Sequence, residues 1–124
     1  MDTDLKTTTE QVQGKDAMTV LHLTGWLDKK SEERFYEIAH DVYEQGARWL
    51  ILDMAEVDTL TSAGMRALTQ VYKLFTPEAE QYTASRVKIY GAPEHISHVL
   101  NITGILKYIP NYENMQAAID SFNE

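Results

Sequence analysis

The amino-acid sequence predicts a single α/β domain spanning residues 1–124, with a mixed, largely parallel sheet of four to five strands and about four helices. Short apolar runs of strand length alternate with longer segments whose apolar residues recur at helical spacing. Residues 49–52 are continuously apolar, which is typical of a strand covered on both faces in a parallel sheet. The length of 124 residues and the hydrophobic content of 44% suit one domain with a substantial core.

The first quarter of the chain is expected to form an edge strand and a core strand. We expect residues 1–6 to be frayed and residues 7–13 to form a short edge strand. Residues 19–23 alternate between apolar and polar types and are rich in β-formers, which predicts a strand. The glycine-containing segment 25–28 then predicts a turn.

The first helix is indicated by a cap and an apolar stripe. Ser31 is predicted to be its N-cap, because Glu32 and Glu33 follow in the first turn, where acidic side chains suit the helix dipole. Gly46 is expected to end the helix. The stripe has the i, i+3, i+4, i+7 spacing of an amphipathic helix and consists of Phe35, Ile38, Ala39 and Val42.

The central segment combines a strand, a polar loop and a helix. The strand over residues 49–52 is expected to end at Asp53, with the polar loop after it. Ser62 is predicted to be the N-cap of a buried helix over residues 62–75, which Pro77 stops. Because sites in parallel sheets lie beyond the carboxyl ends of the strands, we expect Asp53 and Ser62 at the same edge.

The last third of the chain is expected to add one core strand, two helices and a short final strand. Residues 76–85 predict a polar loop or a helical extension, and residues 87–90 predict a core strand. Pro93 is expected to open a short helix. Residues 105–109 predict a final short strand, and Asn111 is expected to cap the last helix.

Charge and composition exclude several classes of partner. The net charge of −8 argues against nucleic acid and against an anionic membrane surface, since both are bound by Lys and Arg. The chain has no cysteine, and no apolar run approaches the 18–20 residues that span a bilayer. The first six residues contain no apolar signal region. We therefore expect a cytoplasmic protein that is not inserted in a membrane.

Motifs for metal, cofactor or catalytic chemistry are not found in the sequence. His95 and His98 lie three residues apart, but no third ligand is spaced to complete a metal site. No dinucleotide-binding glycine pattern, Walker loop or nucleophile-elbow motif is present. We expect neither cofactor nor metal, and no enzymatic activity.

Three segments resemble the STAS domain, the sulphate-transporter and anti-sigma-factor-antagonist family. Residues 23–28, Leu-Thr-Gly-Trp-Leu-Asp, are similar to the family's Leu-Thr-Gly-Glu-Leu-Asp turn. Residues 50–65 are similar to its central strand–loop–helix signature, and residues 99–105 to its late Phe-x-x-x-Gly-Leu segment. The segments occur in family order, and the chain is most similar to the free-standing bacterial anti-sigma factor antagonists.

The resemblance implies helices packed mainly on one side of the sheet, and it implies partner switching in transcription regulation. In this family the unmodified antagonist binds an anti-sigma factor, often a serine kinase, and so frees a sigma factor. The kinase phosphorylates the serine two residues before a glycine, and a serine phosphatase reverses this. Ser62 and Gly64 match those positions, and Asp28 matches the aspartate of the family's turn.

The chain departs from the family pattern around the serine. Thr61 stands where the family often has aspartate, Ala63 where a second hydroxyl is common, and Arg66 where a small residue is usual. Trp26 would offer aromatic surface as a binding anchor. The predicted partner-binding residues are Trp26, Asp28, Thr61, Ser62, Ala63, Gly64, Met65 and Arg66.

Three other classes of function compete with partner switching. A response-regulator receiver would use Asp53 as phosphoryl acceptor, but the paired acids after residues 19–23 and a Lys-Pro after Tyr90 are missing. A small enzyme would need a base, a nucleophile and an orienting group, and the sequence assembles no such trio. A STAS subunit of a lipid transporter or sensory complex, in which Ser62 is not phosphorylated, remains the main alternative.

Overall fold

Five strands and four α-helices make up the described part of the chain, residues 3–15, 17–81 and 83–122 of a computed structural model. The strands are β1 (Lys6–Gln11), β2 (Met18–Leu27), β3 (Trp49–Leu60), β4 (Val87–Tyr90) and β5 (Asn111–Tyr112). The α-helices are α1 (Glu32–Glu44), α2 (Ser62–Phe75), α3 (Glu94–Ile102) and α4 (Met115–Ser121), and two short 3-10 helices are η1 (Glu78–Glu80) and η2 (Ile105–Lys107).

The strands form one sheet in the order of the sequence, β1-β2-β3-β4-β5. β1 pairs antiparallel to β2, whereas β2, β3, β4 and β5 are parallel to one another. The predicted mixed, largely parallel α/β sheet is therefore confirmed. The predicted edge strand is also present, and it begins one residue earlier than expected.

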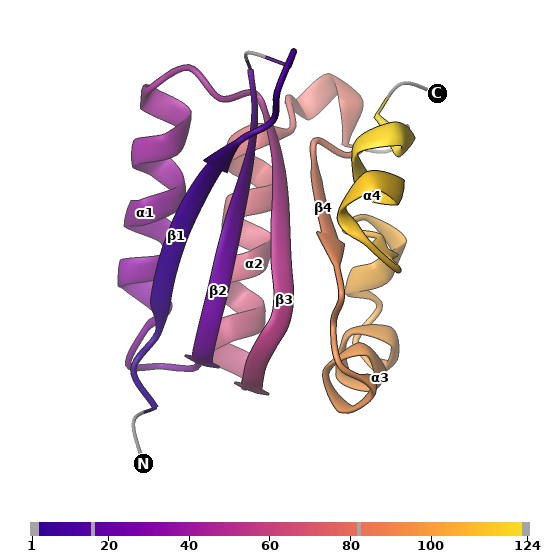
Figure 1. The fold of residues 1–124 in the computed structure, drawn as a ribbon. Coiled ribbons are helices and arrows are strands. Elements are labelled where there is room, and N and C mark those ends of the chain that lie inside the picture. The colour runs from indigo at the N-terminus through magenta and orange to yellow at the C-terminus, as the bar shows by residue number, and fades with distance from the viewer. Residues whose placement is uncertain (1–2, 16, 82, 123–124) are drawn as a thin grey trace.

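The two faces of the sheet are covered unequally. The larger core lies between the sheet and α1, α2 and α3, and α2 lies behind β2 and β3 in Figure 1. A smaller core on the other face joins α4 to the sheet through Ile119 and Ile51. Alternation along the strands explains the division, since Leu50 and Leu52 point to one face and Ile51 points to the other. The helices thus pack mainly on one side, as expected.

β2 and β3 are longer than predicted, which moves two of the predicted boundaries. β3 does not end at Asp53 but continues to Leu60, because its second half stays paired with β2 up to Leu27. Likewise, residues 25–27 belong to β2 and do not form a turn. Gly25 has a φ of +110° at a shift in register, and a Cβ there would lie 2.5 Å from the Asp4 carbonyl oxygen, so the strand bends without ending.

Residues 3–6 contact β2 and α1, so the prediction that residues 1–6 are frayed is wrong for its described part. Leu5 is only 2% exposed, and its carbonyl oxygen accepts a hydrogen bond from the Arg34 guanidinium. The Thr3 carbonyl accepts a hydrogen bond from the Trp26 amide. Residues 1–2 lie outside the described residues. One buried leucine and two backbone contacts are enough to hold the segment against β2 and α1.

Two predictions near the C-terminus are also wrong. Residues 105–109 contain η2, because Ile105 and Ile109 are both buried at helical spacing and the Ile109 amide donates to the Ile105 carbonyl. Asn111 lies in β5 and not at a helix start. The N-cap of α4 is Asn114, whose Oδ1 accepts a hydrogen bond from the Ala117 amide at 2.9 Å.

Candidate functional site

Ser62 is the first residue of α2, and its side chain is exposed at the end of the sheet where β2 and β3 finish. It is not the N-cap. That position belongs to Thr61, whose Oγ1 accepts a hydrogen bond from the Gly64 amide at 3.4 Å. Within the described part of the chain, no hydrogen bond engages the Ser62 hydroxyl. Because the neighbouring threonine caps the helix, the Ser62 hydroxyl can be modified without loss of the cap.

Gly64 lets the first turn of α2 touch the end of β2. A Cβ at Gly64 would lie 2.2 Å from the Leu27 carbonyl oxygen and 2.9 Å from the Leu27 Cβ. The same carbonyl accepts a hydrogen bond from the Thr61 amide at 3.0 Å. This contact holds the start of α2, and with it Ser62, at a constant position on the sheet.

Replacing Gly64 by alanine is therefore expected to destabilise the domain by about 1–3 kcal/mol, because the added methyl group meets backbone that cannot move aside cheaply. Urea unfolding monitored by circular dichroism would measure the loss. Gln70→Ala, on the exposed face of the same helix, is the matched control and should change the free energy of unfolding by less than about 0.5 kcal/mol. Equal stabilities of Gly64→Ala and Gln70→Ala would contradict the close contact.

Asp28 organises the connection between β2 and α1. Its Oδ1 accepts a hydrogen bond from the Ser31 amide at 3.1 Å and also lies 3.1 Å from the Ser31 Oγ. The Ser31 Oγ also lies 2.7 Å from the Trp26 carbonyl, to which it donates. Ser31 occupies the N-cap position of α1, but its side chain makes no capping hydrogen bond, contrary to the prediction. Since Asp28 directly follows Leu27, this turn lies beside the first turn of α2.

Trp26 is placed on the other side of the strand from α2. Leu27 points into the core beneath α2, and adjacent side chains of a strand point to opposite faces. The Trp26 indole N–H donates to the Asp58 carboxylate at 3.1 Å, and His95 Nε2 contacts the Asp58 carbonyl oxygen at 2.8 Å. Trp26 and Ser62 thus lie at the same end of the sheet but not on one face.

Arg66 extends the site toward α1. Its Nη2 donates to Glu32 Oε1 at 3.0 Å, and its Nε donates to Oε2 of the same carboxylate. Hydrogen bonding by Arg66 is the main reason why the pKa of Glu32 lies below its usual value of 4.5, and Glu32 in turn raises the pKa of Arg66. Sequence reasoning missed Glu32, because nothing local in the sequence pairs two residues 34 positions apart.

The predicted partner-binding residues differ in accessibility. Ser62 and Arg66 are exposed, and Thr61, Met65, Asp28 and Trp26 are partly buried. Ala63 is 8% exposed, and Gly64 is also buried. The accessible surface at the start of α2 is therefore formed mainly by Ser62 and Arg66, with the two buried residues beneath them.

The STAS domain family model matches residues 9–118. The chain belongs to the STAS domain family. The family resemblance predicted from the sequence is thereby confirmed.

Individual proteins similar to this STAS domain include antagonists of anti-sigma factors. The Bordetella bronchiseptica protein named "Putative anti-sigma factor antagonist BtrV" is 27% identical over 108 residues, covering 86% of this chain and 88% of that protein. An anti-sigma factor antagonist from Mycobacterium paratuberculosis has a similar structure, with a TM-score of 0.81 at 18% identity, covering 100% of this chain and 98% of that chain.

Structures of SpoIIAA in two forms also share the fold. The unphosphorylated form of this anti-sigma factor antagonist has a TM-score of 0.73 at 18% identity, over 95% of this chain and 96% of that one. The phosphorylated form, from Bacillus, has a TM-score of 0.65 at 17% identity, over 94% of this chain and 99% of that one.

A second polar cluster of this STAS domain lies on the sheet face that carries α4, and it contains Asp53. His22 Nδ1 lies 2.6 Å from Asp53 Oδ2, and His22 Nε2 lies 2.8 Å from Glu10 Oε1. Asp53 Oδ1 accepts a hydrogen bond from the Ala55 amide. The expectation that Asp53 shares an edge with Ser62 is wrong, because β3 runs on for seven more residues after Asp53.

The cluster changes the acidity of two of its members. Burial lowers the pKa of His22, but hydrogen bonds and charge from Asp53 and Glu10 outweigh this effect, so the pKa is raised above 6.5. Burial, followed by the charge of Asp53, raises the pKa of Tyr90 to about 12. The cluster thus links β1, β2 and β3 through a histidine held between two carboxylates, with Tyr90 of β4 beside it.

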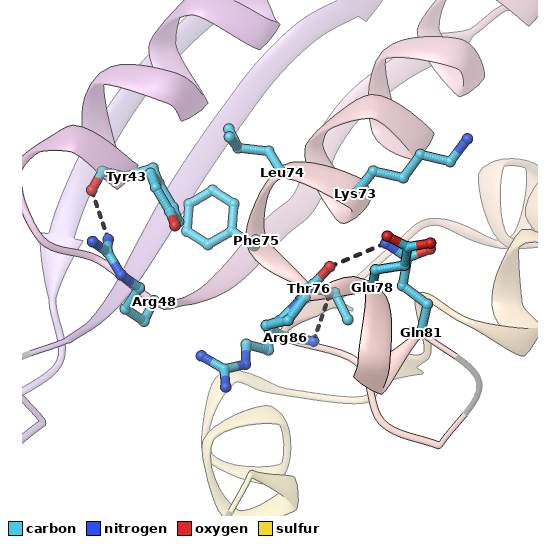
Figure 2. A pocket seen from close by; sticks show the side chains of 10 residues that line it. Tyr43, Arg48, Lys73, Leu74, Phe75, Thr76, Glu78, Gln81 and Arg86 are labelled. Carbon is cyan, nitrogen blue, oxygen red and sulfur yellow. Dashed lines mark hydrogen bonds between the residues drawn. The ribbon is translucent and has the colours of Figure 1, made fainter.

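A cavity of about 690 Å³ lies at the opposite end of α2 from Ser62 (Figure 2). Arg48 and Arg86 line it, but both already have partners. Arg48 donates to the Tyr43 carbonyl oxygen at 2.8 Å, and Arg86 forms an ion pair with Glu80 at 2.8 Å. The carboxyl ends of α1 and α2 lie at the cavity, where their dipoles disfavour anions, and Glu78 of η1 adds a negative charge to its lining. Arg48 thus contacts the end of α1, and Arg86 is paired with the last residue of η1.

Among residues 3–15, 17–81 and 83–122, no group of three His, Asp or Glu side chains could hold a metal ion. No helix within these ranges combines the length and apolar character that crossing a bilayer requires.

Proposed function

We propose that this STAS domain is an anti-sigma factor antagonist, and that phosphorylation of Ser62 controls its docking on an anti-sigma factor. The names of the similar proteins support the first part. The observation that carries the second part is the position of Ser62, which is exposed at the start of α2 with a hydroxyl that the helix cap does not use. A relative of the same fold is described in a phosphorylated form.

The physical basis of the switch is the charge of the phosphate. Phosphorylation adds about −1.5 to −2 charges at neutral pH. Within the domain this charge is tolerated, because it is exposed and lies at the positive end of the α2 dipole. In a docked complex the phosphate must lose water, which costs several kcal/mol unless a cation meets it. The fold therefore survives modification, while the complex does not.

The proposal defines the partners by their chemistry. The unmodified domain binds an anti-sigma factor that is itself a serine kinase, and a serine phosphatase acts on the phosphorylated form. The domain supplies the acceptor hydroxyl and no catalytic group. A transporter or sensory complex would instead bind the domain without modifying Ser62.

Intact-mass analysis after incubation with the cognate kinase and ATP tests the proposal. The protein is expected to gain the mass of one phosphate, and the Ser62→Ala variant is expected to gain none. Ser97→Ala is the matched control, since this other serine starts no helix and should leave the modification unchanged. A phosphate that is still added to Ser62→Ala would assign the site to another residue and end the proposal.

A further inference from the structure

Arg66 and Ser62 lie on the same face of α2. They are four residues apart in one helix, and side chains at this spacing are neighbours. Both side chains are exposed, and residues 62–66 are all helical. A phosphate on Ser62 would therefore lie within reach of the Arg66 guanidinium. An anion that precedes a cation by four residues is the favourable order on a helix.

Arg66 is already engaged with an anion on another helix. Two of its N–H groups reach the Glu32 carboxylate, which ties the first turn of α2 to the first residue of α1. The Arg66 side chain is 52% exposed and the Glu32 side chain is 13% exposed, so the ion pair is open to water and salt mainly on its Arg66 side. A competing anion can therefore reach the guanidinium from the solvent.

Glu32 would keep other partners if Arg66 left. The Lys29 ammonium lies 3.4 Å from Glu32 Oε1. Glu32 is also the first residue of α1, where the helix dipole favours a negative charge. A phosphate, by contrast, carries a larger charge and three acceptor oxygens that match the planar guanidinium. The balance of partners therefore favours the phosphate.

We propose that Arg66 exchanges partners when Ser62 is phosphorylated, leaving the Glu32 carboxylate and binding the phosphoserine. This inference rests on the proposed function only for the modification of Ser62. The exchange breaks the Arg66–Glu32 ion pair between α2 and α1, so that Lys29 is the cation that remains beside Glu32. The guanidinium of Arg66 then pairs with the phosphate. One modification thereby alters the surface at the starts of two helices.

The test uses protein in which phosphoserine is inserted at position 62 during translation, so that no kinase is needed. The second pKa of the phosphate is measured by phosphorus NMR in the parent, Arg66→Gln, Arg66→Lys and Glu32→Gln. We expect a value about 0.3 lower in the parent than in Arg66→Gln, with Arg66→Lys between them. Glu32→Gln should not raise it. Lys73→Gln, which removes an exposed cation at the far end of α2, is the control and should match the parent.

The pKa of the Glu32 carboxyl shows whether Arg66 leaves Glu32 when Ser62 is phosphorylated. In the unmodified protein, Arg66→Gln should raise the pKa of Glu32 measured by carbon NMR, because Arg66 now lowers it. In the phosphorylated protein the same substitution should leave the pKa of Glu32 unchanged. An equal rise in the pKa of Glu32 in both forms would show that Arg66 stays with Glu32. A phosphate pKa that is the same in the parent and in Arg66→Gln would show that Arg66 does not reach the phosphate. Either result overturns the exchange.

The outcomes separate this inference from the proposed function. The phosphoserine is placed without kinase or partner, so the NMR results do not depend on whether a cell modifies Ser62 or on which protein the domain binds. Failure of the intact-mass experiment would leave the Arg66 result standing as a property of the modified surface. Failure of the NMR experiment would leave the docking switch in place without a change at α1.

Discussion

Phosphorylation of Ser62 is expected to weaken binding of the STAS domain to its anti-sigma factor at least tenfold. Tenfold corresponds to about 1.4 kcal/mol, which is less than the several kcal/mol needed to desolvate a phosphate whose charge of about −1.5 to −2 exceeds the single positive charge of Arg66. The free energy of unfolding should change by less than about 0.5 kcal/mol, because Ser62 is exposed and Thr61 supplies the helix cap. The two effects together would show that the phosphate acts on docking and not on the fold.

Isothermal titration calorimetry of the unmodified protein, the phosphoserine protein and Ser62→Ala would measure the affinities, and urea unfolding would measure the stabilities. Ser62→Ala should bind like the unmodified protein, since it adds no charge. Phosphoserine at position 83 is the matched control, because Thr83 is exposed in the segment that follows η1, near the far end of α2. Identical affinities with and without phosphate on Ser62 would contradict the proposal that phosphorylation controls docking.

The stability of the domain is expected to fall as the pH rises from about 6 to 9, and His22 is the group responsible. Its pKa is raised above 6.5 in the folded state because Glu10 of β1 and Asp53 of β3 hold its two ring nitrogens. Tyr90 of β4, beside Asp53, stays neutral in this range because its pKa is raised to about 12. A raised histidine pKa stabilises the fold fully below the unfolded value of 6.5. That contribution is lost as the pH passes the folded value.

Urea unfolding of the parent and of His22→Gln across this pH range would measure the effect. At pH 6 the substitution should cost about 1.5–3 kcal/mol, the contribution of a charged hydrogen bond, and the cost should shrink at pH 9. Glu10→Gln removes one of the two carboxylates from an exposed strand and should reduce the pH dependence without abolishing it. Parallel stability curves for the parent and His22→Gln would show that His22 does not carry the pH dependence.

The region around Ser62 could be predicted from the sequence, whereas the polar cluster around His22 could not. Ser62 could be proposed from the sequence, because the strand, the loop and the helix that define its position are contiguous. Its role as an N-cap was wrong, since Thr61 is an equally good capping residue and only the position of the strand end decides between them. The Glu10–His22–Asp53 cluster was missed, because its members come from three strands whose register no local pattern reveals.

The sequence by itself determined the α/β class, the largely parallel sheet, the bounds of α2 and β4, and the family. Each of these depends on local periodicity or on short motifs in order along the chain. Only the tertiary structure decided how far β2 and β3 extend, because their length follows from pairing between segments about 30 residues apart. It also decided that Arg66 meets Glu32 and that Asp53 meets His22. Such contacts depend on how the strands and helices are placed in space, and this placement is set by the whole core.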